Sequence, residues 1–215
     1  MTSGDLPQEI QNSILNKANF DNYKPMPNTY SITEILSCLR QKFYQKTLPK
    51  KNIELKTAIN FYRGNLWDNA FSPLFKRNQI RCTYRCKNIP ICISGKFDFL
   101  TSDGIVTDLK SPSNLFYVER NGKPSETYRK QVLFYCYTNA QTKGQIMYWD
   151  GSKCLMYPIE VTDEKCKELI EEVESRTVIL WASLHNGKVP NKEIYPPETW
   201  MCQCCDFSIK CTQEQ

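Results

Sequence analysis

Three ionisable side chains lie on two apolar segments that a short turn joins. Asp98 lies near the end of the first segment, and Asp108 and Lys110 lie near the end of the second. The Ser-Asp-Gly turn at residues 102–104 would pair the segments as strands, bring the two aspartates together and place Asp108 and Lys110 on one face. Two carboxylates suit Mg²⁺ or Mn²⁺, and a nearby lysine can stabilise charge that develops on a phosphate. The alternative interpretation is a surface hairpin with acidic residues near its turn.

A second polar pair lies on a helix predicted over residues 126–139. Gln131 and Tyr135 are four residues apart and therefore share one face of that helix. Gln131 can bind a metal-bound water or the substrate, and Tyr135 can contact a backbone phosphate. The alternative interpretation is a partly buried polar pair without a catalytic role.

The hairpin residues and the Gln131–Tyr135 pair, taken in their order along the chain, resemble the motifs of the RecB-like branch of the PD-(D/E)XK nuclease superfamily. Residues 95–98 resemble its Gly-x-x-Asp motif, residues 108–110 its (Asp/Glu)-x-Lys motif and residues 131–135 its Gln-x-x-x-Tyr motif. The resemblance implies an α/β (α+β) mixed sheet, with a restriction-endonuclease-like core flanked by helices. It implies the catalytic residues Asp98, Asp108, Lys110, Gln131 and Tyr135. It also implies a metal ion held by Asp98, Asp108 and the backbone carbonyl of Leu109.

The expected third side-chain ligand departs from the family pattern. Family members usually carry a metal-binding histidine a few residues after a glycine, whereas this chain has Asp68 after Gly64. Aspartate also binds Mg²⁺ or Mn²⁺, so Asp68 is the candidate third ligand; otherwise it is a helix-surface carboxylate beside a weakened site. We attribute Gly64, inside a predicted helix, to close packing or function. His185, the one histidine, is interpreted as structural or as a partner of a helix C-terminus.

Cysteines near the C-terminus have the spacing of metal ligands, C-x2-C-x5-C, from Cys202 to Cys211. Residues 31–44 and 202–211 resemble the cysteine segments of the CRISPR-associated RecB-like exonuclease family, whose members carry an iron–sulfur cluster. The resemblance implies one cluster, expected to be 4Fe–4S, that joins the two ends of the chain through Cys38, Cys202, Cys205 and Cys211. A zinc site is the main alternative, and Cys204 is surplus to either. The other six cysteines are interpreted as core residues: Cys82, Cys86, Cys92, Cys136, Cys154 and Cys166.

Positive charge is concentrated in one part of the chain. The net charge is +5, and between Arg40 and Lys96 only Glu54 and Asp68 are acidic among many lysines and arginines. This excess suits a polyanion such as nucleic acid, although a solvated surface is equally compatible with it. Aromatic residues in the same region are core candidates, with stacking on bases as the alternative: Phe61, Tyr62, Trp67 and Tyr84.

The chain length and the resemblance together predict a single nuclease domain over residues 1–215. Its parts are a helical segment (1–50), a core (51–185) and a cysteine segment (186–215). Predicted helices cover residues 6–18, 32–43, 53–71, 126–139 and 162–184, and predicted strands cover 80–86, 89–100, 104–109, 144–149 and 153–159. A linker is predicted over residues 21–30, and Ser31 with Glu34 has the pattern of a capping box at the start of the helix that follows. Thr162 is expected to cap the last long helix, and Asn186-Gly187 to stop it. A Pro-rich connector precedes the final cysteines.

The resemblance implies a metal-dependent DNA exonuclease acting on single-stranded DNA or DNA ends, with endonuclease activity also open. It would act in CRISPR spacer acquisition, an antiviral defence, or in recombination or replication of a virus. Expected partners are DNA and CRISPR adaptation proteins, and a homo-oligomer is left open. The alternatives are a catalytically weak nucleic-acid-binding or scaffold subunit and a zinc-braced interaction module. The sequence contains no apolar run of about 18 residues that would predict a membrane span. Its first residues lack the pattern of a secretory signal. We therefore expect a cytoplasmic protein, in the host cytoplasm if a virus encodes it.

Overall fold

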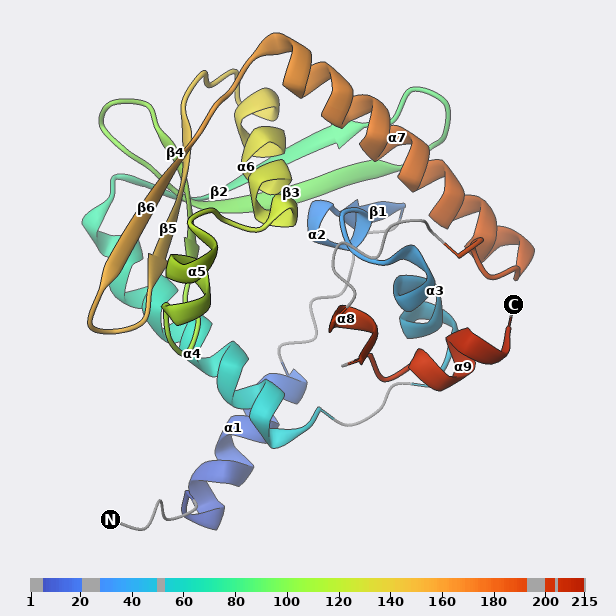
Figure 1. Cartoon of the computed structure of the whole chain (residues 1–215), viewed down its shortest axis with the longest axis horizontal. Coiled ribbons are helices and arrows are strands. Elements are labelled where there is room, and N and C mark those ends of the chain that lie inside the picture. Colours follow the sequence, from blue (N-terminus) through green and yellow to red (C-terminus); the bar gives the residue numbers. More distant parts are fainter. Residues whose placement is uncertain (1–5, 21–27, 50–52, 193–199, 204, 215) are drawn as a thin grey trace.

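The computed structural model describes residues 6–20, 28–49, 53–192, 200–203 and 205–214 (Figure 1). Within these ranges the strands form one six-stranded mixed sheet, in the order β1-β3-β4-β5-β6. Strands β1 and β4 pair with opposite ends of one edge of β3, and β2 pairs with the other edge. The strands are β1 (Thr29–Ser31), β2 (Arg77–Arg85), β3 (Cys92–Leu100), β4 (Val106–Lys110), β5 (Gly144–Trp149) and β6 (Cys154–Ile159). Most of the predicted linker, most of the Pro-rich connector and Cys204 lie outside the described residues.

Five of the strands confirm the prediction from sequence, and β1 does not. Thr29 and Tyr30 were assigned to a linker and Ser31 to a helix start, but all three residues pair in parallel with β3, Thr29 opposite Cys92 and Ser31 opposite Ser94. The β4 and β5 strands are also parallel, so the chain must cross over between them. Helices α5 (Phe116–Asn121) and α6 (Glu126–Thr138) make this crossover.

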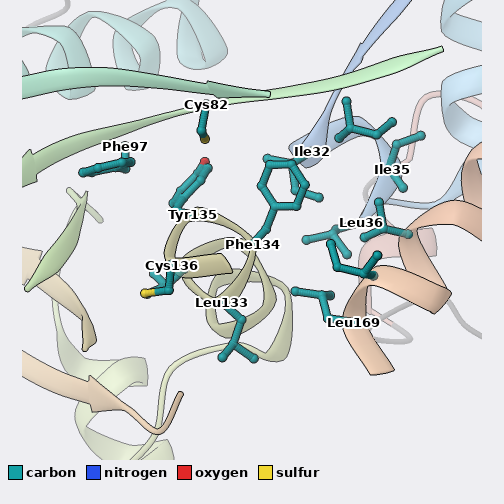
Figure 2. Packing of buried hydrophobic residues seen from close by; sticks show 14 of the residues in the cluster. Ile32, Ile35, Leu36, Cys82, Phe97, Leu133, Phe134, Tyr135, Cys136 and Leu169 are labelled. Atoms are coloured by element: carbon teal, nitrogen blue, oxygen red, sulfur yellow. The ribbon is translucent and has the colours of Figure 1, made fainter. Parts of the chain in front are cut away.

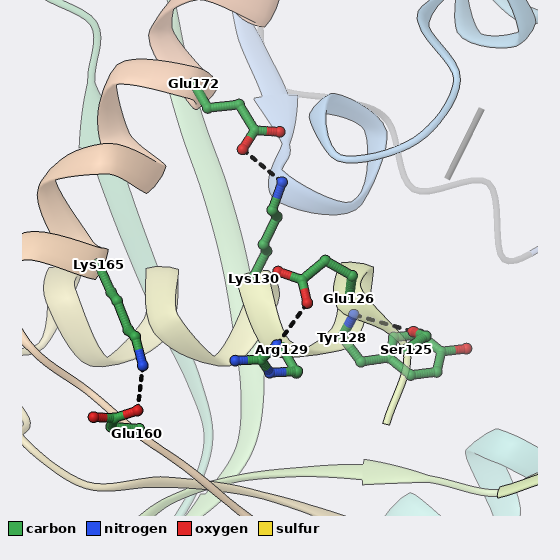
Figure 3. A network of polar contacts seen from close by, with 8 residues as sticks. All are labelled: Ser125, Glu126, Tyr128, Arg129, Lys130, Glu160, Lys165 and Glu172. Carbon is green, nitrogen blue, oxygen red and sulfur yellow. Dashed lines mark hydrogen bonds and ion pairs between the residues drawn. The ribbon is translucent and has the colours of Figure 1, made fainter. Parts of the chain in front are cut away.

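The core lies where α6 packs against the sheet and α7 (Asp163–Asn186) packs against α6 (Figure 2). The approach of α6 to the sheet is close: a Cβ added to Gly144 of β5 would lie 2.5 Å from Val132 Cγ1 and 2.9 Å from Cys136 Sγ. An ion pair of 2.6 Å between Lys130 and Glu172 joins α6 to α7 (Figure 3). As predicted, Thr162 caps the N-terminus of α7, and Gly187 ends it with a left-handed backbone.

Helix α4 (Leu55–Phe71) is anchored to β5 by aromatic rings. The ring of Trp149 meets those of Trp67 and Phe71 edge-on, at centroid distances of 5.7 and 5.9 Å. The 3-10 helix η1 (Ser72–Leu74) follows α4. At its other end α4 packs against α1 (Gln8–Phe20). Phe61 and Tyr62, which we assigned to the core, are 55% and 43% exposed, because this half of α4 contacts α1 rather than the sheet.

The helix predicted over residues 32–43 is two helices, α2 (Ile32–Ile35) and α3 (Leu39–Thr47). The predicted capping box, in which Ser31 and Glu34 bond each other's backbone amides, begins α2. Arg176 of α7 then donates to the carbonyls of Ile35 and Ser37, where α2 has ended. Cys38 consequently has an extended backbone at the N-cap of α3 and does not lie inside a helix.

Most, but not all, of the cysteines assigned to the core are buried. Cys82, Cys86, Cys136 and Cys166 are buried and Cys92 is half-buried. Cys154 is exposed, because it begins β6 on the outward face of that strand. Among the helices in the described ranges, none is both long and apolar enough to cross a membrane.

Candidate active site

The candidate site lies at a gap in the pairing of β3. On one side of β3, β1 pairs with residues 92–94 and β4 pairs only with Phe99 and Leu100. Among the described strands, none is paired with residues 95–98 on that side. Asp98 lies at this gap, and its Oδ2 accepts a hydrogen bond of 2.5 Å from the backbone amide of Leu109 in β4. At this gap, Lys96 and Asp98 line a cleft together with Asp108, Leu109 and Lys110 of β4.

Asp98, Asp108 and Lys110 come together as the hairpin predicted. The pairing of Phe99 with Thr107 brings Asp98 and Asp108 to the same level of the hairpin, and both carboxylates are buried. Lys110 Nζ lies 2.6 Å from Asp108 Oδ2 and 4.6 Å from the centre of the Tyr128 ring. The two contacts hold the ammonium group beside the carboxylates.

The proximity of these groups changes their protonation. Burial, with repulsion from Asp108 and Asp68, raises the pKa of Asp98 to about 7. Burial alone would lower the pKa of Lys110, but the attraction of Asp108 outweighs it and raises that pKa. Lys110 therefore remains a cation across the neutral range.

A cleft of about 1000 Å³ brings the predicted residues to one surface. Its lining includes every residue predicted for the site: Asp68, Asp98, Asp108, Leu109, Lys110, Gln131 and Tyr135. Asp68 comes from α4, whose position Trp67 and Phe71 fix against Trp149. Burial and repulsion from Asp108 raise the pKa of Asp68, against the opposing effect of Lys96 and Lys110. Asp68 is therefore part of the same electrostatic environment as the hairpin.

Gln131 and Tyr135 form the α6 wall of the cleft. Gln131 Nε2 donates to Thr33 Oγ1 at 2.9 Å, while its buried Oε1 has no hydrogen-bond partner among the described residues. Tyr135 is buried, its hydroxyl points toward Cys82 in Figure 2, and its ring lies against Gly95. Gln131 thus offers an acceptor to the cleft, and Tyr135 supplies the packing that shapes it.

The donor set of the cleft fits a hard divalent cation in part. Asp98 and Asp108 are adjacent buried carboxylates whose repulsion a cation would relieve, and all the donors are oxygen atoms. Within the described ranges, however, no three His, Cys, Asp or Glu side chains are close enough together to hold a metal ion. Asp68 is thus a cleft residue rather than a member of a preformed triad.

Comparison with known proteins was informative only at the level of structure. No family model and no curated protein sequence matches the chain. The crystal structure of SSO0001 superposes with a TM-score of 0.70 at 17% identity, over 96% of this chain and 98% of that one. An alkaline exonuclease from Laribacter hongkongensis has a TM-score of 0.51 at 13% identity, over 74% of this chain and 91% of its own. A phage-related exonuclease from Haemophilus somnus has a TM-score of 0.51 at 12% identity, over 80% of this chain and 99% of its own.

The chain has a restriction-endonuclease-like nuclease fold. The mixed sheet and its flanking helices, predicted from the motifs, are thereby confirmed. In this nuclease-like fold the gap in β3, the β4 residues Asp108 to Lys110 and the crossover helix α6 converge on one cleft.

Helix α3 and the C-terminal residues of the chain lie together, joined by hydrogen bonds and by the packing of aromatic rings. Buried Arg40 of α3 donates to the carbonyls of Pro190 at 3.1 Å, Cys211 at 3.3 Å and Glu214 at 2.9 Å. The ring of Tyr44 also packs against that of Phe207, at 5.5 Å. Arg40, which we placed on the basic DNA-binding surface, is therefore a structural residue.

The four predicted cluster cysteines lie on these two adjacent ends. Cys38 is at the start of α3, Cys202 belongs to α8 (Trp200–Gln203) and Cys211 to α9 (Ser208–Gln213). Cys205 lies between α8 and α9. The fold thus brings the segments together without forming a closed set of thiolates in the described ranges.

Three contributors to the cleft were not predicted. Thr33 fixes the orientation of Gln131, and its place inside the capping box gave no sign of this role. Gln79 of β2 has a φ of +50° and directs Nε2 to within 3.5 Å of Asp98 Oδ1. Helix α1 lines the cleft through Ile14, Lys17 and Ala18. The sequence predicted α1 as an amphipathic helix, but this pattern does not indicate which part of the protein the helix packs against.

Proposed function

We propose that this protein is a metal-dependent nuclease that hydrolyses phosphodiester bonds in DNA. The observation that carries the proposal is that the hairpin, α4 and α6 direct all the predicted catalytic and metal-binding residues into one cleft. The fold it shares with an alkaline exonuclease and a phage-related exonuclease supports the same reading.

Lys110 acts as a fixed positive charge in this proposal. Its raised pKa excludes the role of a neutral base, and its contacts with Asp108 and Tyr128 keep it at the cleft. An ammonium group held there stabilises the extra negative charge of a phosphate under attack. Gln131 Oε1, which lacks a protein donor in the described structure, accepts a hydrogen bond from the attacking water or a substrate hydroxyl and so orients it. Tyr135 acts indirectly, by holding Gly95 and hence Asp98 in place.

Asp98, Asp108 and the Leu109 carbonyl would hold a Mn²⁺ or Mg²⁺ ion, and Asp68 would be the third side-chain ligand. When bound, it supplies a Lewis acid and lowers the pKa of a coordinated water. Asp98 is then held as a carboxylate, because a nearby cation favours its charged form.

The substrate is single-stranded DNA or a DNA end, cut exonucleolytically, with endonuclease activity secondary. Lys17, Lys96 and Lys110 line the cleft, so it suits a polyanionic strand. Phe61 and Tyr62 also line it, and their exposed rings can stack on bases. The biological role we propose is CRISPR spacer acquisition alongside adaptation proteins, or recombination or replication of a virus, in the cytoplasm.

A nuclease assay with matched variants tests the catalytic proposal. Labelled single-stranded DNA is incubated with Mn²⁺ and with wild type, Asp98→Ala or Lys110→Ala. Cleavage by wild type and a loss of about a hundredfold or more in both variants is expected. Asp98→Ala removes a ligand of the proposed metal ion, and Lys110→Ala removes the ammonium group that stabilises charge at the reacting phosphate. Equal loss of substrate in all three samples would mean contamination and would overturn the proposal.

We further propose that Cys38, Cys202, Cys205 and Cys211 hold an iron–sulfur cluster. The neighbourhood of the two cysteine segments, fixed by Arg40 and Tyr44, supports it. Anaerobically purified protein should be brown, absorb near 400 nm and contain iron and sulfide. Zinc alone in the metal analysis would contradict the cluster and favour the tetrahedral zinc site.

A further inference from the structure

A second cavity, of about 610 Å³, opens beside the candidate active site. It lies between α5, the start of α6 and β5, and it shares Lys110 and Ser111 with the first cleft. The two spaces therefore border the same two residues, one of them the proposed catalytic lysine. A group bound in the second cavity therefore lies next to whatever is bound at Lys110.

Aromatic rings form the wall of this cavity. Tyr128 lies between Lys110, whose Nζ is 4.6 Å from its ring centre, and Tyr148, whose ring is 6.4 Å away. At the rim Tyr117 is 67% exposed and meets the ring of Phe116 edge-on at 5.4 Å, which leaves most of its surface in solvent. Such an exposed ring offers a flat face on which a planar group can stack.

The rest of the lining combines Pro112, Val118 and Pro124 with polar and charged side chains. Lys123 and Arg129 line the cavity, and Arg129 is ion-paired with Glu126 at 2.7 Å (Figure 3). The volume falls within the range of small-ligand sites, about 300–1,000 Å³. Aromatic faces beside lysine and arginine match a ligand that is planar and apolar on one part and anionic on another. A nucleotide has this chemistry.

We propose that this cavity binds the base and sugar of the nucleotide adjacent to the phosphate that is cut, with Tyr117 stacking on the base. The inference rests on the proposed nuclease function, because it uses Lys110 as the point where the phosphate lies. A strand whose phosphate contacts Lys110 has its next nucleoside beside Ser111, at the mouth of the cavity. Tyr117 is then a substrate-positioning residue that determines how firmly the strand end is held.

Phe116 and Tyr117 provide a matched pair of variants. Both are exposed aromatic residues at the start of α5, but only Tyr117 lines the cavity. Phe116→Ala and Tyr117→Ala are compared with wild type after thermal unfolding has verified that all three are folded. Binding of a fluorescein-labelled oligothymidylate is measured by anisotropy in EDTA, and cleavage is measured separately with Mn²⁺.

Tyr117→Ala is expected to weaken binding and raise KM about tenfold, the range of one base–aromatic stack, while Phe116→Ala changes both less than twofold. Oligonucleotides with one abasic position then locate the effect. An abasic nucleotide next to the cleaved bond should weaken wild type about tenfold and leave Tyr117→Ala unchanged, whereas abasic sites elsewhere should weaken both proteins equally.

The outcomes separate this inference from the proposed function. Cleavage by wild type with equal effects of Phe116→Ala and Tyr117→Ala would overturn the nucleotide pocket and leave the nuclease proposal intact. Tyr117-dependent binding without any cleavage would overturn the nuclease proposal and keep the cavity as a nucleotide site. An abasic effect that is the same in wild type and Tyr117→Ala would show that no base stacks on Tyr117.

Discussion

The ring of Tyr135 lies directly against the backbone of Gly95. A Cβ built on Gly95 would come within 2.5 Å of Tyr135 Cε1 and within 3.1 Å of Ile32 Cγ2. Gly95 begins the segment that ends at Asp98, and Tyr135 belongs to the same helix face as Gln131. The glycine and the tyrosine of two separate motifs are thus a single packing contact that sets the distance between β3 and α6.

Gly95→Ala should destabilise the protein by about 1–3 kcal/mol, because the buried ring must move to admit a methyl group. Gly64→Ala is the matched control: a Cβ there would meet only Ser111 Oγ, at 3.8 Å, so close packing does not explain Gly64. In helix α4 the change should stabilise by about 0.5–1 kcal/mol. Urea unfolding measures both, and equal effects of the two changes would refute the contact.

Stability in EDTA should fall as pH rises through neutrality. Asp98 has a pKa of about 7 in the folded protein against 3.8 for an ordinary aspartate, so between these values the folded state binds more protons than the unfolded chain. The stabilisation is complete below about pH 4 and is lost above about pH 7, and each pKa unit corresponds to about 1.4 kcal/mol. Asp98→Asn, which keeps an acceptor for the Leu109 amide, should remove this slope. The difference between wild type and variant in melting temperature at pH 5 and pH 8 isolates the effect, and parallel pH curves would contradict it.

Mn²⁺ should stabilise wild type more at pH 8 than at pH 5, because protons compete with the metal for the carboxylates. Saturating metal at about 100 times its Kd would add about 2.7 kcal/mol. Asp98→Asn should abolish the shift in melting temperature, and Asp68→Asn should reduce it. If Mn²⁺ raises the melting temperature of Asp68→Asn as much as that of wild type, Asp68 is a surface residue of α4. The metal ion then has only Asp98 and Asp108 as side-chain ligands.

Arg40→Lys should destabilise the contact between the two ends of the chain by at least about 2 kcal/mol, because a lysine cannot reach three carbonyls at once and leaves buried acceptors unsatisfied. Lys46→Ala, on the same helix, breaks a partly exposed ion pair with Glu34 and should cost less than about 1 kcal/mol. Thermal unfolding compares the variants. Limited proteolysis should release the C-terminal segment sooner in Arg40→Lys only, and identical digestion of both variants would argue against the clamp.

The sequence by itself determined the local structure and the residues of the candidate site. Alternation along residues 91–110 gave β3 and β4, the spacing of Gln131 and Tyr135 gave one face of α6, and Ser31 with Glu34 gave a helix start. These features depend on neighbours in the chain, and their patterns survive without knowledge of the fold. Asp98, Asp108 and Lys110 belonged together for the same reason, since a short hairpin joins them.

Only the tertiary structure decided the features that join distant segments. Arg176 binds carbonyls at the point where the helix predicted over residues 32–43 is divided into α2 and α3. Arg40 does not lie on the basic surface but binds carbonyls of the C-terminal segment. Phe61 is exposed, because α4 contacts α1 rather than the sheet there. The gap in the pairing of β3 and the cavity beside Lys110 depend on where strands and helices that are far apart in sequence come to lie. Periodicity records which side of an element is apolar, but it does not record which partner covers that side, so packing alone fixed the shape of the site.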